Sequence, residues 1–162
     1  QGAQPIMSYN FGAGNKERVK KAFFTQFKVC TIFTSCFWLI MLLFPKLFAG
    51  IFSNNTDLIT YTAWALRIYM AGIFSLGFQV SCQQSFMALG QAKVSLLLAC
   101  LRKLILLIPL IFILPLFIQD KVFAVFLAEP ISDIVAATIT TITFMSRFNG
   151  ILNKGSKMKT VE

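Results

Sequence analysis

Long apolar blocks alternate with short polar segments along the chain, and this pattern predicts its elements. Four blocks stand out, at residues 22–45, 57–89, 92–118 and 121–147. Each is long enough to cross the roughly 30 Å hydrocarbon layer of a bilayer, which takes about 20 helical residues. None shows the strict alternation that is typical of barrel strands. The pattern therefore predicts four membrane-spanning helices.

The segments around these blocks complete the expected order. Residues 1–12 are apolar and carry no charge, which is typical of the end of a membrane helix and not of a signal peptide with its basic opening region. Residues 13–28 are expected to form a cytoplasmic loop and an amphipathic helix, and residues 148–162 a basic cytoplasmic tail. We therefore expect an all-α, polytopic membrane bundle that is a piece of a longer protein.

Composition supports a membrane protein. The 162 residues are 57% hydrophobic, include 18 phenylalanines and have a mean hydropathy of +0.74. These values lie well outside the usage of soluble domains, because a soluble protein of this size could not bury so much apolar surface. The lipid bilayer is thus the first partner that the sequence predicts.

The basic residues indicate an orientation. Of the 15 lysines and arginines, three fall on one predicted side: Lys46, Arg67 and Lys121. The other twelve are assigned to the opposite side, with Arg102 and Lys103 at the entry of the third span: Lys16, Arg18, Lys20, Lys21, Lys28, Lys93, Arg102, Lys103, Arg147, Lys154, Lys157 and Lys159. Because basic residues are enriched in cytoplasmic loops, the loop at Gly12 and the C-terminus are predicted to be cytoplasmic. The net charge of +9 then reports topology and not nucleic-acid binding, since no stacking aromatics are interleaved with these lysines.

Residue types that support catalysis or metal binding are scarce. The chain has four cysteines without a CxxC pair and no histidine, which disfavours zinc, haem and thiol chemistry. No nucleophile, base and orienting group appear together, so we expect no enzyme and no cofactor. The glycine-rich segment at residues 12–17, GAGNKE, lacks the Lys-Ser/Thr pair of a phosphate-binding loop and is expected to be a turn.

Four strings in sequence resemble the MATE (multidrug and toxic compound extrusion) transporter family. The first looks like the signature that closes the eighth helix of the family, and its hinge and motif residues here are Gln4, Pro5, Asn10, Gly12 and Gly14. The others follow in the family's order: ALGQAK at residues 88–93, LRKLILLIPLIFILP at 101–115 and AEPISD at 128–133. The resemblance covers essentially the whole chain.

The resemblance implies a twelve-helix antiporter of two six-helix lobes in the cell membrane. Such a protein exports organic cations or drugs against an inward flow of sodium ions or protons. This chain would supply the end of helix eight through helix twelve, and the N-terminal lobe would be absent. Some members carry an ion-binding acid in the tenth helix, but residues 61–90 contain none. The alternatives are a lipid or polysaccharide-precursor flippase of the same architecture and a non-transporting membrane subunit.

The last apolar block carries the strongest candidate site. One face combines small and polar residues at three- and four-residue steps, among them Glu129, Asp133 and Thr140. Ionisable residues inside a membrane helix are costly and usually face a bundle interior or water, which makes both acids candidates for the substrate or ion pathway. For Glu129 the alternative is a solvated position near the outer interface, or one that complements the helix dipole.

The second block carries a similar stripe, on which Gln79 and Gln83 lie one helical turn apart. Their amides are candidates for lining a cavity and contacting substrate. The alternative, which the sequence favours slightly, is hydrogen bonding between packed helices.

Overall fold

The computed structural model describes residues 2–158, and side chains up to residue 153. Gln1 and Lys159, which entered the expectations above, lie outside the described residues, as do the side chains of Lys154 and Lys157. The described residues form helices joined by short loops: α1 (Ala3–Gly12), α2 (Lys16–Leu43), α3 (Pro45–Phe52), α4 (Thr56–Tyr69), α5 (Ile73–Ala88), α6 (Ala92–Cys100), α7 (Ile108–Phe117) and α8 (Lys121–Met158). A 3₁₀ turn, η1 (Met70–Gly72), joins α4 to α5, and a π-helical segment, η2 (Leu101–Leu107), joins α6 to α7.

Four stretches of helix in the described residues are long and apolar enough to span a membrane, as predicted. They are Lys16–Leu43, Thr56–Ala88, Ala92–Phe117 and Lys121–Asn153. The second contains α4, η1 and α5, and the third contains α6, η2 and α7. The predicted elements differ in three details: the expected amphipathic helix is the first part of α2, α8 continues beyond residue 147, and the loop after α2 contains the short helix α3. Pro45 begins α3, where its fixed φ favours the first helical turn.

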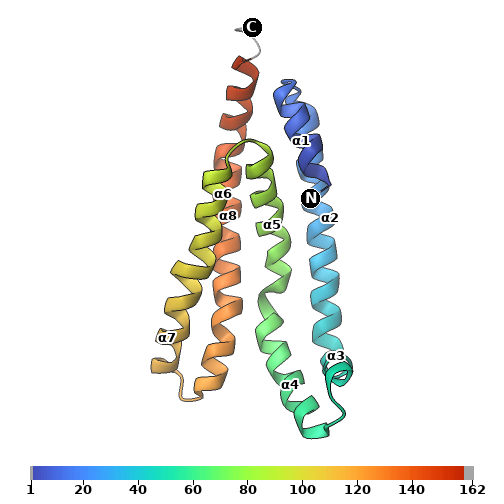
Figure 1. Ribbon diagram of the computed structural model, residues 1–162, viewed down its shortest axis with the longest axis vertical. Coiled ribbons are helices and arrows are strands. Elements are labelled where there is room, and N and C mark those ends of the chain that lie inside the picture. Colours follow the sequence, from blue (N-terminus) through green and yellow to red (C-terminus); the bar gives the residue numbers. More distant parts are fainter. Residues whose placement is uncertain (1, 159–162) are drawn as a thin grey trace.

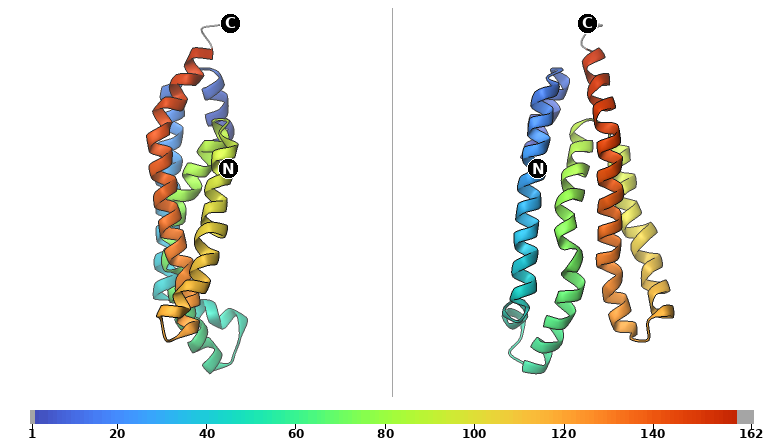
Figure 2. Two further views of the ribbon diagram at one scale, coloured as in Figure 1. Left: turned by 90° about the vertical axis from the view of Figure 1, so that its left-hand side faces the viewer. Right: turned by 180° about the vertical axis from the view of Figure 1, so that it is seen from behind.

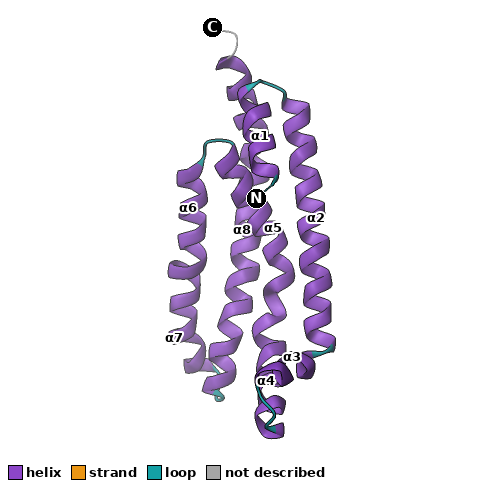
Figure 3. Ribbon diagram, turned by 45° about the vertical axis from the view of Figure 1, so that its right-hand side comes forward, coloured by secondary structure: helices purple, strands orange, loops and turns teal. Residues whose placement is uncertain are grey.

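The spans lie side by side, with α5 and α8 in the middle (Figure 1). α2 packs along one side of α5, and the α6–η2–α7 span packs along α8 on the other side. α1 packs on α2 and α5, and the views from the side and from behind agree with this order (Figure 2). Helix accounts for nearly all of the described chain, and the connections are short (Figure 3). The two central helices therefore hold most of the buried positions.

Aromatic packing joins α2, α5 and α8 in the core. The ring centroid of Phe144 lies 4.6 Å from that of Phe23 and 4.9 Å from that of Phe86. Phe148 and Met7 extend this buried cluster. Such ring pairs add about 0.5–1.5 kcal/mol each beyond the area that they bury. This end of the bundle is thus held mainly by apolar contacts.

Two tight turns need glycine because their φ angles are positive. Gly14, between α1 and α2, and Gly90, between α5 and α6, each have φ +73°. A left-handed backbone costs other residues roughly 1–2 kcal/mol. Gly12 differs, since it ends α1 and a Cβ there would meet nothing within 4 Å. Of the two motif glycines, Gly14 is the one that the turn requires.

Large apolar side chains cover much of the outside of the bundle. Phe33, Phe112 and Leu116 are strongly exposed, whereas small and polar residues such as Ser81, Ser85 and the α8 face are buried. This distribution is the reverse of that of a soluble domain, and large exposed apolar patches mark membrane or protein contacts. It agrees with spans that present their apolar side to lipid.

Candidate functional site

The small and polar face of α8 points into the bundle, as the spacing predicted. Glu129, Ser132, Asp133 and Thr140 are buried, together with Ala136 and Ala137. The opposite side, with Ile134, Val135, Ile142 and Met145, is exposed. The face packs on α5 and on the α6–η2–α7 span. Both candidate acids therefore lie inside the lobe.

Each acid pairs with a basic residue of η2. Arg102 Nε donates to Asp133 Oδ1 at 2.6 Å, and Lys103 Nζ donates to Glu129 Oε1 at 2.7 Å. Arg102 Nη2 also approaches Glu129 Oε1 at 3.5 Å. We call Arg102, Lys103, Glu129 and Asp133 the ionic cluster. Its two positive and two negative charges balance, as burial within a membrane span requires.

The ionic cluster corrects two sequence-based expectations. Arg102 and Lys103 were assigned to the cytoplasmic entry of the third span, but they lie well inside Ala92–Phe117. At 1.5 Å per residue, Lys103 is about 16 Å from the start of that span. The alternative in which Glu129 is simply solvated is also wrong, because its carboxylate is buried and paired. Without the two residues, ten basic residues remain on the predicted cytoplasmic side against three, so the orientation argument stands.

A local widening of the third span presents both cations to α8. Pro109 has no N–H for the carbonyl of Ile105, and its ring presses against that carbonyl, which an α-helix tolerates poorly. The π-helical turns of η2 precede this proline. Widened turns of this kind free backbone groups and occur often at functional sites. Here the carbonyl of Arg102 accepts a hydrogen bond from Ser132 Oγ at 2.8 Å.

The junction between α4 and α5 packs against the same part of α8. A Cβ on Gly72 would lie 2.8 Å from Pro130 Cα, 3.0 Å from Pro130 O and 3.1 Å from Asp133 Cβ. Only glycine permits this close approach of backbones. Three departures from regular helix, η1, η2 and the proline of α8, thus meet around Asp133. The sequence analysis did not identify Gly72, Arg102 or Lys103 as site residues.

The other polar candidates are buried without all of their hydrogen bonds. Gln79 Oε1, Gln83 Nε2 and Thr140 Oγ1 have no partner among the described residues, and the same holds for Asn10 Oδ1, whose Nδ2 donates to Ile6 O at 2.8 Å. The hydrogen bonds between helices that were expected of the two glutamines are therefore not made by these atoms. A buried polar group without a partner is costly, which favours a role in binding something else.

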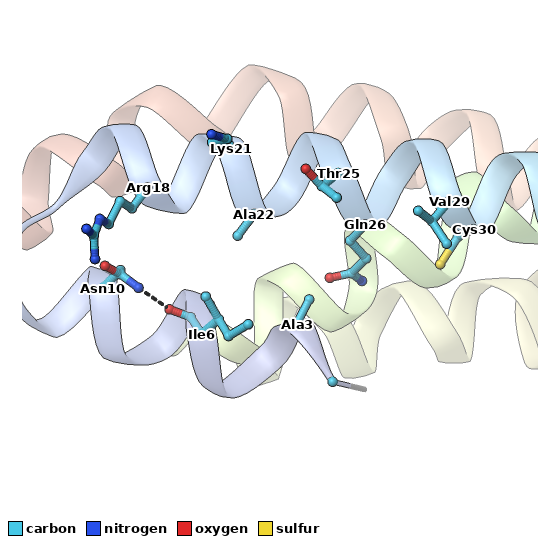
Figure 4. A pocket seen from close by; sticks show the side chains of 11 residues that line it. Ala3, Ile6, Asn10, Arg18, Lys21, Ala22, Thr25, Gln26, Val29 and Cys30 are labelled. Carbon is cyan, nitrogen blue, oxygen red and sulfur yellow. Dashed lines mark hydrogen bonds between the residues drawn. The ribbon is translucent and has the colours of Figure 1, made fainter.

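A cavity of about 540 Å³ lies between α1 and α2, away from the ionic cluster (Figure 4). Asn10 of α1 faces Arg18 of α2, and Gln26 of α2 reaches toward α1. Its charged lining residues are Arg18 and Lys21, and it includes no acid. The cavity is therefore a poor site for a cation. In the described part of the chain no group of three or more His, Cys, Asp or Glu residues could hold a metal ion.

Comparisons with known proteins agree with this architecture. Solved structures of a multidrug resistance MATE family transporter of the MOP superfamily match in the inward-facing conformation (TM-score 0.84) and in the outward-facing conformation (TM-score 0.83), both at 18% identity, over 92% of this chain and 34% of that one. The MATE multidrug transporter DinF-BH, solved in complex with the dye rhodamine 6G, matches at 30% identity and TM-score 0.81, over 92% of this chain and 33% of that one. A search of curated proteins gave no match.

The chain thus spans about a third of the length of these transporters. The family model MatE matches residues 1–113, which include the turn at Gly14 and the cations of η2. The chain belongs to the MATE family of multidrug transporters.

Proposed function

We propose that this chain is the C-terminal part of a MATE antiporter that exports organic cations or drugs, driven by the entry of sodium ions or protons. The ionic cluster is the observation that carries this proposal. Carboxylates inside a membrane span are expensive and mark ion or substrate pathways. Asp133 and Glu129 would carry the cation, and the unpartnered polar atoms of Gln79, Gln83 and Thr140 would line its path.

The proposal places the protein in the plasma membrane, with the N-terminal lobe of the same chain as its partner. The loop at Gly14 and the end of α8 lie at the same end of the bundle, where Lys16 Nζ donates to Asn153 Oδ1 at 2.9 Å. The loop before α4 lies at the opposite end (Figure 1). The excess of basic residues favours the first end as the cytoplasmic one.

Cysteine labelling of intact cells tests this orientation. In the complete transporter with its native cysteines replaced, a cysteine at Asn55 should react with an impermeant thiol reagent added outside. Cysteines at Asn15 or Ser156 should react only after the membrane is opened. Asn15 and Asn55 are both exposed at helix ends, so the positions are matched in access. Reaction of all three from one side would contradict the proposed orientation.

Transport in vesicles tests the function itself, with the rhodamine dye of the DinF-BH complex as the probe. Vesicles that contain the complete transporter should accumulate the rhodamine dye when a sodium gradient or a proton gradient is imposed, and the effective gradient identifies the coupling ion. Vesicles without protein give the background. A dye signal equal to that background under both gradients would contradict the proposal.

A further inference from the structure

The two acids of the ionic cluster are held differently. Asp133 has a side chain only 4% exposed, contacts Arg102 Nε at 2.6 Å and packs beside Gly72. Glu129 has a side chain 10% exposed, and both of its ion pairs use the same oxygen, Oε1. Asp133 is thus enclosed by a fixed partner, whereas Glu129 depends mainly on Lys103.

The two cations also differ. The side chain of Arg102 is 20% exposed, and its guanidinium bridges both acids. The side chain of Lys103 is 53% exposed and contacts Glu129 alone. An ammonium is a compact charge on a flexible four-carbon stem, so it can leave one partner more readily than a bridging guanidinium can. Lys103 is the movable member of the cluster.

The exposed side of Lys103 needs a polar environment. Lys103 lies near the middle of its span, where a charge facing lipid would cost several kcal/mol. Charged residues at such depth face a bundle interior or a water-filled cavity. The ammonium and the Glu129 carboxylate that it covers are therefore within reach of a solute in the path between the lobes.

Charge balance limits how a cation can bind there. With Lys103 in place the ionic cluster is neutral, so an added cation would leave an unbalanced positive charge in a low-dielectric region. A cation that replaces the ammonium on Glu129 keeps the carboxylate paired at every stage. Exchange is therefore favoured over simple addition.

We propose that Lys103 is a tethered competitor of the exported cation. Its ammonium occupies Glu129 when the cargo is absent and leaves the carboxylate when a monovalent organic cation binds. Arg102 stays on Asp133 and keeps that acid neutralised throughout. This inference rests on the proposed function and adds a residue that sets affinity: Lys103 weakens cargo binding and thereby speeds release.

Binding of the rhodamine dye, which is an organic cation, to the purified complete transporter tests the inference by fluorescence polarisation. Lys103→Gln removes the competitor and should tighten dye binding about tenfold, which corresponds to about 1.4 kcal/mol. Lys103→Met keeps the apolar stem and should do the same, so the test survives if one variant is not recovered. Glu129→Gln should weaken binding, and in that background Lys103→Gln should have no effect, because the two residues act as a pair.

Lys93→Gln is the matched control. Lys93 is an exposed lysine of α6, in the same span, and has no ion pair in the described structure. Its loss should leave the affinity for the rhodamine dye unchanged. Equal tightening by Lys93→Gln, or unchanged or weaker binding in both Lys103 variants, would overturn the inference while leaving a transporting parent protein consistent with the proposed function. A parent that neither binds nor transports the dye would contradict both.

Discussion

Asp133→Asn should abolish most export by the complete transporter. The substitution nearly keeps the shape of the side chain but removes the charge that balances Arg102 at 2.6 Å. Breaking a buried ion pair on one side costs about 3–5 kcal/mol, because the remaining charge stays buried without its partner. We expect lower thermal stability and at least about a tenfold loss of export, since each 1.4 kcal/mol corresponds to a factor of ten. Efflux of the rhodamine dye, normalised to the amount of protein in the membrane, measures this.

Asp57→Asn is the matched control for this change. Asp57 is exposed in the first turn of α4 and makes no ion pair in the described structure, so its substitution should leave export unchanged. Glu129→Gln should reduce export less than Asp133→Asn, because Glu129 is more exposed. Full export by the Asp133→Asn transporter would contradict a role for this acid.

Gly72→Leu should strongly destabilise the transporter. Even the first carbon of a side chain would lie 2.8 Å from the backbone of Pro130, so η1 and α8 would have to separate. Overpacking of this kind costs about 1–3 kcal/mol or more, and the movement would also displace Asp133 from Arg102. Thermal unfolding of the protein in detergent should show a clear fall in the transition temperature.

Gly150→Leu provides the comparison for Gly72→Leu. Gly150 also lies in a helix, but a Cβ there would meet nothing within 4 Å. Its substitution should keep the transition temperature of the parent. If the Gly72 and Gly150 variants unfolded at the same temperature, the close packing of η1 on Pro130 would be refuted.

The four spans could be predicted from sequence because length and hydropathy decide whether a helix crosses a membrane. The buried face of α8 could be predicted because residues three and four apart share a side of a helix. The breaks at Gly72 and at Leu101–Leu107 could not be located, since they depend on packing against α8. Uniform spans were therefore expected where the structure has three joined segments.

The candidate site was predicted by halves. Glu129 and Asp133 were recognised because acids in an apolar helix are unusual. Arg102 and Lys103 were placed at the membrane edge because counting charges along the sequence does not show which residues meet across helices. A usable signal was present: two acids inside one span require two cations inside another, and the third span carries just such a pair.

The match to inward-facing and outward-facing structures bears on how this lobe works. The TM-scores of 0.84 and 0.83 are nearly equal, so the fold of these helices fits both conformations. The ionic cluster joins α8 to the neighbouring span inside this unit. We expect it to persist as the lobes change their relative position, with Lys103 as its movable part.

Export by the double variant Arg102→Gln/Asp133→Asn tests the central claim most directly. The double variant removes both charges of the shortest ion pair together, so no charge of that pair is left buried and thermal stability should return toward that of the parent. If Asp133 serves the transport cycle, efflux of the rhodamine dye should remain as low as in Asp133→Asn alone despite the recovered stability. Recovery of efflux along with stability would show that the ion pair only holds the fold together, and would contradict the account.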